Sequence, residues 1–420
     1  MQKKFSERPL ILFLPFFFIY ALLIVVQNND SLFGDEGRYL MFAQNLLQGF
    51  YSPPPPDINL WNGPGFPLYL VPFIAAGLPF LVIKLFNAVL YYGVLVLFYK
   101  TLSTFLDKRK SFLFSIAFAC YYMPYKSLPH MLSETFAEFL VATITFYAAS
   151  FFFATPPTKK WRYRVIIPVL LAVLALTKVI FGTVYVAAAI IFLLFFLKTK
   201  NVRYKNSFFL MLCALLLCAP YLYYTWTLTG KIFYWSNAGG KSFYWMSNPV
   251  KGEWGEWHKD LPILHPGSSA GQESLIYTHK DDNEIISHYT GVQRDDKFKE
   301  LAMRNVSEHP GKFFLNWMAN WSRMFFNYPA DYVSFQMSTL GNMFANIPLL
   351  LLIIYSSFLA IKNKKQIPFA LKFLLCIAGI YLLGSSLLSA YDRMFYILAP
   401  VFGFWICYCL TQFRKRAATI

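Results

Sequence analysis

The residues best suited to chemistry form one short segment, Gly34-Asp35-Glu36-Gly37-Arg38-Tyr39, directly after the first apolar run. Two carboxylates, a guanidinium and a phenol are costly to place beside a bilayer, and charged groups there are typically functional. A carboxylate can take a proton from an attacking hydroxyl, and a cation can stabilise a leaving anion. On this segment alone, a helix N-cap at Asp35 with a solvated Glu36–Arg38 pair is an equally good interpretation.

Other charged side chains stand near the ends of apolar runs further along the chain. Glu134 and Glu138 are four residues apart, so a helix presents both on one face. Lys178 lies between two apolar runs, and Asp392 and Arg393 precede the last one. Each alone could be an interfacial side chain that reaches to water. Their common depth on one side of a membrane favours a shared site.

The composition indicates which elements position these residues. The chain is 57% hydrophobic and 14% charged, whereas soluble domains carry about 25% charged residues. A bilayer core requires about 20 apolar residues per helix, and runs of that length recur. We therefore expect an all-α polytopic membrane protein with about ten transmembrane helices. The expected spans are Leu10–Val26, Leu81–Tyr99, Phe112–Tyr125, Leu132–Phe153, Val165–Thr177, Val179–Leu197, Phe208–Trp226, Leu340–Ile361, Phe369–Leu388 and Phe395–Leu410.

The basic residues indicate the orientation. Six basic clusters border apolar runs and hold 21 cations against two acids, Glu7 and Asp107, whereas the polar stretch from Thr227 to Phe335 holds 11 cations and 12 acids. Cytoplasmic loops carry such an excess of Lys and Arg. With the clusters inside, both termini are cytoplasmic and Asp35 is extracytoplasmic. The net charge of +17 therefore does not indicate nucleic-acid binding. The clusters are Lys3, Lys4 and Arg8; Lys100, Lys108, Arg109 and Lys110; Lys159, Lys160, Arg162 and Arg164; Lys198, Lys200, Arg203 and Lys205; Lys362, Lys364 and Lys365; and Arg414, Lys415 and Arg416.

We divide the chain into three parts. Residues 1–226 form an N-terminal transmembrane module, which includes a first extracytoplasmic catalytic loop at 28–80. Residues 227–336 form one compact outer loop domain, and residues 337–420 a C-terminal transmembrane module. Extracytoplasmic juxtamembrane helices are expected in both outer segments, among them an amphipathic helix over Lys312–Phe326 that lies on the outer surface.

Several kinds of chemistry are not expected. The cytoplasmic loops are too short for a phosphate-binding glycine-rich loop or a nucleotide-binding βαβ unit. All six cysteines fall inside apolar runs, so no disulfide framework is expected in the outer loop. No two histidines have the short helical spacing of a zinc site. We therefore predict no metal site.

The order of these motifs resembles the polyprenyl-phosphate-sugar-dependent glycosyltransferases of the C-type fold, which include protein O-mannosyltransferases and bacterial lipid A aminoarabinose transferases. The resemblance runs through nearly the whole chain. Many members carry a lysine where this chain has Asn62-Gly63, so a phosphate ligand is missing there or supplied elsewhere. The chain is also short, without the larger C-terminal outer domain of some members. The matching motifs are Asp35, Glu36, Arg38 and Tyr39; Trp61-Asn62-Gly63-Pro64-Gly65-Phe66-Pro67-Leu68; Ser133-Glu134; Thr177-Lys178; His309-Pro310; and Arg393 with Pro400.

The resemblance implies an inverting transfer of a sugar from a polyprenyl-phosphate donor to a lipid, glycan or protein hydroxyl. It implies no metal and no cofactor, because the lipid-linked sugar phosphate is itself the donor substrate. The expected partners are membrane lipids, this donor and an acceptor, but no nucleic acid. The expected location is the bacterial inner membrane, with the site on its extracytoplasmic face. The implied roles are catalysis by Asp35 and Glu36, donor-phosphate binding by Arg38, Tyr39, Lys178 and Arg393, and orientation of acceptor or sugar by Glu134 and Trp61.

Two alternatives remain open. A transporter or lipid flippase without transferase activity predicts charges at mid-bilayer and pseudo-symmetric halves. Here the charges crowd the outer rim, and no convincing internal repeat is visible. A non-catalytic membrane scaffold predicts that an isosteric replacement of Asp35 changes only local stability.

Overall fold

The computed structural model describes residues 8–29, 31–153, 160–258, 270–333, 335–363 and 367–413, and throughout these ranges the regular secondary structure is helical. Some residues of the predicted basic clusters lie outside these ranges: Lys3, Lys4, Lys159, Lys364, Lys365, Arg414, Lys415 and Arg416. The side chain of Lys160 is also not described. The helices are α2 (Pro9–Leu12), α3 (Leu14–Val26), α4 (Glu36–Leu47), α5 (Gly65–Ala75), α6 (Phe80–Leu102), α7 (Lys108–Ala119), η1 (Met123–Ser127), α8 (Ser133–Phe153), α9 (Lys160–Thr177), α10 (Ile180–Thr199), α11 (Val202–Leu217), α12 (Ala219–Thr229), α13 (Gly239–Met246), α14 (Ala270–Thr278), α15 (Lys280–Ser287), α16 (Gly291–Glu308), α17 (Pro310–Phe326), α18 (Met337–Lys362), α19 (Phe369–Ser386), α20 (Asp392–Tyr396) and α21 (Ala399–Gln412).

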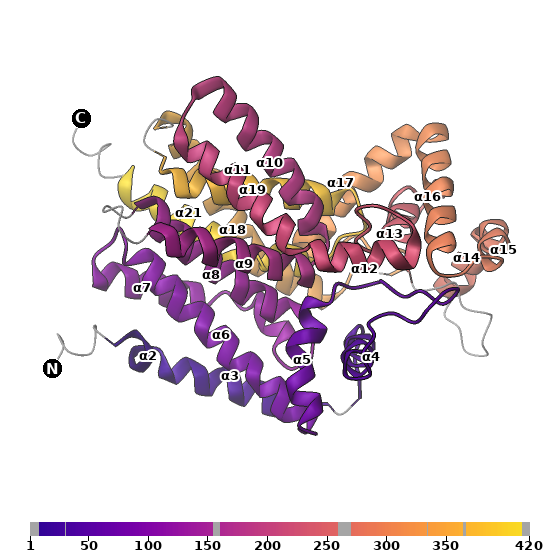
Figure 1. Ribbon diagram of the computed structural model, residues 1–420, viewed down its shortest axis with the longest axis horizontal. Coiled ribbons are helices and arrows are strands. Elements are labelled where there is room, and N and C mark those ends of the chain that lie inside the picture. Colours follow the sequence, from indigo (N-terminus) through magenta and orange to yellow (C-terminus); the bar gives the residue numbers. More distant parts are fainter. Residues whose placement is uncertain are drawn as a thin grey trace.

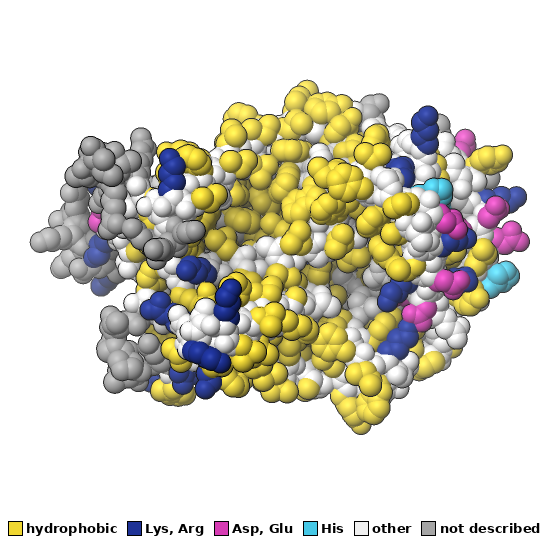
Figure 2. Space-filling model, turned by 90° about the horizontal axis from the view of Figure 1, so that it is seen from above, with side chains coloured by type: hydrophobic (Ala, Val, Ile, Leu, Met, Phe, Trp, Pro, Cys, Tyr) yellow, Lys and Arg dark blue, Asp and Glu magenta, His cyan; other side chains and the backbone are white. Residues whose placement is uncertain are grey.

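The apolar helices form one bundle, and α13 to α16 lie together at one end of it (Figure 1). The face in Figure 2 shows hydrophobic side chains across the middle of the molecule. Lys and Arg gather at one end of this face, while cations, acids and histidines share the other. This distribution agrees with an integral membrane protein whose outer end carries the mixed charges.

Five helices in the described ranges are long and apolar enough to cross a membrane. The bent pair α11 and α12, with an angle of 48° at the break, makes a sixth if it is counted as one span. The other four expected spans coincide with helices that are shorter or more polar, α3, α7, α9 and α21. The polytopic helical class is thus confirmed, whereas the count of ten spans and the three-part division stay predictions. The five helices are α6, α8, α10, α18 and α19.

The first outer segment contains two helices. One is α4, which buries Tyr39, Leu40 and Phe42. The other is α5, whose start lies in the motif from Trp61 to Leu68 and for which no separate helix was predicted. It packs against α4.

Helix α17 covers the residues of the predicted amphipathic helix, but its polar face is buried and much of its apolar face is exposed. Asn316, Asn320 and Arg323, spaced along one side, are buried, whereas Phe314 and Leu315 are more than half exposed. Buried polar groups must be hydrogen-bonded, and these are bonded to loops of the outer end. The amphipathic helix is therefore confirmed, but its polar face points into the protein.

The polar face of α17 fixes the segment that leads into α20. The Asn320 amide nitrogen donates to the Ser386 carbonyl at 2.7 Å, and its oxygen accepts from the Ala390 amide at 2.8 Å. Arg323 donates to the same Asn320 oxygen at 3.1 Å. Because Ala390 stands three residues before Arg393, these bonds constrain where Arg393 lies.

A second buried polar group lies inside the outer loop domain. The Glu253 carboxylate accepts hydrogen bonds from His279 Nε2 at 2.9 Å and from the Tyr332 hydroxyl at 2.6 Å. Burial opposes the ionisation of Glu253, but the bond and charge of His279 and the bond from Tyr332 outweigh it. They lower the pKa of the carboxyl from 4.5 to about 2.

We predict that the outer loop domain loses stability as the pH falls from about 4.5 to about 2. The unfolded chain takes up the Glu253 proton first, so the stabilisation is complete above 4.5 and is lost on acidification. Glu253→Gln should lack this dependence, and Glu300→Gln, at an exposed carboxylate, should retain it. Thermal unfolding in detergent as a function of pH measures the effect. Equal pH slopes in wild type and Glu253→Gln would contradict the assignment.

Candidate active site

Asp35 stands at the N-cap of α4, but its side chain makes no capping hydrogen bond. Gly34 precedes it with φ +57°, a conformation that suits glycine. The carboxylate instead forms an ion pair with Arg38, and its Oδ2 lies 3.4 Å from Arg393 Nη1. The structure therefore does not support the interpretation of Asp35 as a helix cap.

Arg393 joins Asp35 to a second carboxylate. Its Nη1 lies 3.6 Å from Glu134 Oε1, and Lys178 Nζ lies 2.6 Å from the same oxygen. Burial opposes the charge of Arg393, but Glu134 and Asp35 outweigh it and raise the pKa of the guanidinium above its usual value. Four residues predicted from separate motifs thus form one ionic cluster, Asp35, Glu134, Lys178 and Arg393. Together with Arg38, we call these five the charge cluster.

Tyr39 is buried and is linked to Arg38 of the charge cluster through Asn62. Its hydroxyl is hydrogen-bonded to Ser133 Oγ at 2.8 Å and accepts from Asn62 Nδ2 at 3.1 Å. Asn62 also accepts from Arg38 Nε at 2.6 Å. Burial, assisted by Glu134 among nearby charges, raises the pKa of Tyr39, so the phenol stays protonated. Asn62 therefore holds Arg38 in place.

Glu36 is separated from the charge cluster by its own hydrogen bonds. Its fully buried carboxylate accepts from the Phe33 amide at 2.5 Å and from the Met131 amide at 2.6 Å. Burial opposes its ionisation, but His130 and these two amides outweigh it and lower the pKa of the carboxyl below 4.5. Glu36 thus joins the loop before α4 to the loop before α8. Its predicted catalytic role stays a prediction.

Trp61, in the first outer segment, contacts residues of the outer loop domain. The Arg38 guanidinium is 5.0 Å from its ring centroid, and Lys241 Nζ is 5.4 Å from it. Trp257 contacts the same ring edge-on at 6.3 Å. Lys241 and Trp257 were not predicted. The one signal in the sequence was the density of aromatic residues in the outer loop.

Two glycines bring the first outer segment against the end of α9. A Cβ on Gly63 would stand 2.1 Å from the Leu176 carbonyl oxygen, and one on Gly65 would stand 2.5 Å from the Thr177 hydroxyl. Only glycine allows such an approach. Because Lys178 follows directly, the glycines place Asn62 and Lys178 on the same side of the site.

Comparisons with known proteins test the fold. No protein-family model matches the chain, and a search of curated proteins gave no match. The chain is similar to the apo crystal structure of the Archaeoglobus fulgidus oligosaccharyltransferase, with a TM-score of 0.50 and 14% identity over 97% of this chain and 52% of that one. A structure of archaeal AglB from the same organism, in complex with an inhibitory peptide and a dolichol-phosphate, is also similar, with a TM-score of 0.49 and 13% identity over 97% and 52% of the two chains.

The chain shares the fold of the apo oligosaccharyltransferase. The C-type fold expected from the sequence is thereby confirmed. The chain spans about half the length of the solved protein. At this identity the likeness concerns the fold, and the activity has to be argued from the site.

One group in the described residues has the geometry to hold a metal ion. Ligand atoms of Glu256, His258 and Asp331 lie within 4.8 Å of one another in the outer loop domain. They bond to one another, His258 Nε2 to Asp331 at 2.9 Å and the Asp331 amide to Glu256 at 2.7 Å. The positive charge of buried Arg323 also acts on both carboxylates. We therefore interpret the group as structural, and the prediction of a metal-free reaction stays a prediction.

We predict that Gly63→Ala destabilises the protein by about 1–3 kcal/mol, the usual cost of overpacking. The added Cβ meets a backbone carbonyl, which cannot turn aside as a side chain can. Gly311→Ala is the control, since a Cβ there has no atom within 4 Å. Thermal unfolding in detergent compares the two variants. Equal melting temperatures would show that Gly63 is not needed for the close approach.

Lys178→Met should destabilise the protein by on the order of 3 kcal/mol, because it removes the closest partner of a buried carboxylate. The double variant Lys178→Met/Glu134→Gln should recover part of the loss. Lys126→Met, which breaks the more exposed pair with Asp392, should cost about 0–1 kcal/mol. Unfolding midpoints measure all three. Similar costs for Lys178→Met and Lys126→Met would argue against the buried pair.

Proposed function

We propose that this protein is an inverting glycosyltransferase that moves a sugar from a polyprenyl-phosphate donor to a lipid, glycan or protein hydroxyl on the extracytoplasmic face of its membrane. The observation that carries the proposal is the charge cluster. A carboxylate, Asp35, contacts two guanidinium groups, Arg38 and Arg393, at the polar end of an apolar bundle. The shared C-type fold supports this class of reaction.

The chemistry follows from the types of side chain. The acceptor hydroxyl oxygen forms a bond to the anomeric carbon, while the bond from that carbon to the phosphate oxygen breaks. The electron pair leaves with the polyprenyl phosphate, and the hydroxyl proton passes to the Asp35 carboxylate as general base. A single displacement of this kind inverts the anomeric centre.

The leaving phosphate requires positive charge more than it requires a proton. The charge cluster contains three cations, Arg38, Lys178 and Arg393, and two carboxylates, Asp35 and Glu134. It therefore carries one net positive charge, which favours an anion. Each guanidinium group can bind two phosphate oxygens at once. The protonated Tyr39 phenol supports Arg38 through Asn62.

A transporter or flippase is the alternative function. Against it, the residues of the charge cluster stand at the starts of helices or in short connecting segments, and not in the middle of long apolar helices. Transport sites lie near the bilayer midplane. The mixed charges at this end support an extracytoplasmic site (Figure 2). We extend the proposal to the bacterial inner membrane as its location.

Asp35→Asn should lower the rate of transfer by about 10²–10⁴-fold, because the amide cannot accept the proton. Asp107→Asn, at an exposed cap beside the cytoplasmic cluster, should not change it. Purified proteins in detergent are supplied with several polyprenyl-phosphate sugars, and release or transfer of the sugar is measured. The unfolding midpoint verifies that the variant is folded.

Two results would contradict the proposal in different ways. An unchanged rate in Asp35→Asn would remove Asp35 from the mechanism. Wild-type protein that binds donors and turns none over, with any acceptor class, would favour the transporter.

A further inference from the structure

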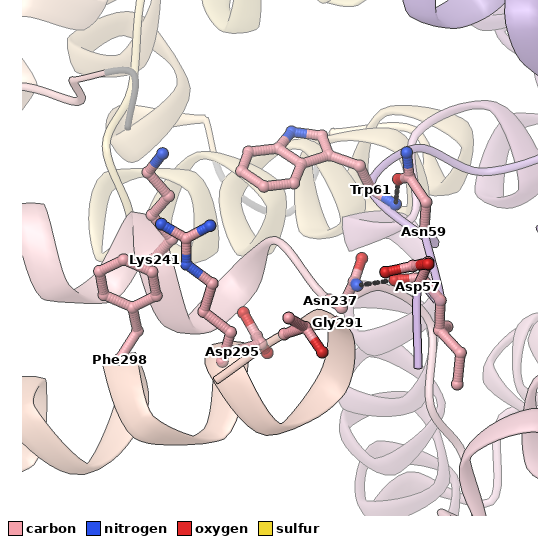
Figure 3. Close-up of a pocket in the computed structure, with 11 residues that line it drawn as sticks. Asp57, Asn59, Trp61, Asn237, Lys241, Gly291, Asp295 and Phe298 are labelled. Atoms are coloured by element: carbon pink, nitrogen blue, oxygen red, sulfur yellow. Dashed lines mark hydrogen bonds between the residues drawn. The ribbon is translucent and has the colours of Figure 1, made fainter. Parts of the chain in front are cut away.

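A pocket of about 320 Å³ opens between the first outer segment and the outer loop domain (Figure 3). This volume is at the lower end of the range for small-molecule sites, about 300–1,000 Å³. Three segments form its walls: the stretch from Asp57 to Trp61, the start of α13, and the first turns of α16. None of the residues assigned to the donor phosphate lines it.

The pocket is next to the charge cluster. Trp61 forms one wall, and the Arg38 guanidinium lies 5.0 Å from the centroid of the same indole ring. Arg38 in turn contacts Asp35. Two side chains, Trp61 and Arg38, therefore stand between a molecule in this pocket and the proposed base.

The lining is charged unequally from side to side. Figure 3 shows Lys241 and Phe298 on one side and Asp57 with Asn59 on the other. Arg294 also lines the pocket, and its guanidinium lies 5.8 Å from the Phe298 ring centroid, on the side of Lys241. Two cations with the Asp295 carboxylate below them thus stand at one side, and Asp57 with Asn59 stands at the other.

Lys241 is held in a fixed position at the wall of the pocket. Its side chain is 3% exposed, and Nζ lies 5.4 Å from the Trp61 ring centroid and 5.0 Å from that of Trp257. Two indole faces thus stabilise a buried cation at the wall of the pocket. Asp295, below it, accepts from the Gly240 amide at 2.7 Å, so one of its oxygens is directed to the backbone.

We propose that this pocket binds the acceptor of the transferase, and that the acceptor is an acidic sugar, a ring that carries a carboxylate or a phosphate. The anionic group lies toward Lys241 and Arg294. The sugar ring packs on Trp61, and its hydroxyls donate to Asp57 and Asn59 on the opposite side. The role as acceptor site rests on the proposed function, whereas the binding of an acidic sugar does not.

The test measures binding without any donor, so that it is independent of turnover. Isothermal titration of the protein in detergent compares methyl glucuronide, glucose 6-phosphate, methyl glucoside and inorganic phosphate. We expect the acidic sugars to bind at least about tenfold more tightly than methyl glucoside, since a bond between charged groups is worth that much or more. The tighter of the two acidic sugars identifies the anionic group as carboxylate or phosphate.

Variants identify the residues. Arg294→Gln should weaken the binding of acidic sugars about tenfold, while Lys299→Gln, at an exposed lysine of the same helix, should not. Arg294→Lys keeps the charge and should preserve the preference for acidic sugars. Unfolding midpoints verify each variant.

Four results would overturn the inference: equal binding of acidic and neutral sugars, no binding of any sugar, equal losses in Arg294→Gln and Lys299→Gln, or inorganic phosphate that binds as tightly as the acidic sugars. Failure of the proposed function looks different. In that case acidic sugars bind in this pattern, but no donor sugar is transferred to them or to any other hydroxyl.

Discussion

The site depends on one constraint: the Glu134 carboxylate is 1% exposed at the start of an apolar helix and must be paired. Lys178, from the turn between α9 and α10, and Arg393, from α20, supply the positive charge. These three segments are far apart in the sequence. Their charges stabilise the protein only if α8, α9 and α20 meet at the outer end of the bundle. The same arrangement leaves Arg393 within reach of Asp35.

The surrounding contacts restrict how far this cluster can adjust. Gly63 and Gly65 leave no space between the first outer segment and the end of α9. Asn320 bonds the backbone just before α20. Glu36 joins the loops before α4 and α8 through two backbone amides. The segments that carry Asp35, Lys178 and Arg393 are thus held by contacts outside the charge cluster, which is how a preorganised site is built.

Much of the site could be predicted from the sequence, because charges beside apolar runs are rare and their order along the chain was informative. Asp35, Glu134, Lys178 and Arg393 were predicted to act together, and the structure brings them together. The sequence does not distinguish adjacent carboxylates, so the burial of Glu36 by the amides of Phe33 and Met131 was not foreseen.

Other features depend on tertiary contacts that no local pattern encodes. The hydrophobic spacing of α17 indicated a helix with two faces, but which face is buried depends on the loops that accept its hydrogen bonds. No separate helix was predicted at the Pro- and Gly-rich start of α5, although the helix packs against α4. The same holds for the membrane spans. Composition predicts where apolar helices lie, but α7 and α9 are shorter or more polar than the five helices that meet both criteria for a span.

Arg38 connects the two halves of the proposed reaction. Its guanidinium contacts the proposed base Asp35, donates a hydrogen bond to Asn62 and lies over Trp61, which is a wall of the proposed acceptor pocket. A phosphate that binds Arg38 competes with Asp35 for the same donor groups and so frees the carboxylate to accept a proton. An acceptor on Trp61 restricts the position of the same guanidinium. In the proposed reaction, donor and acceptor therefore both act on the Arg38 side chain, which holds the proposed base.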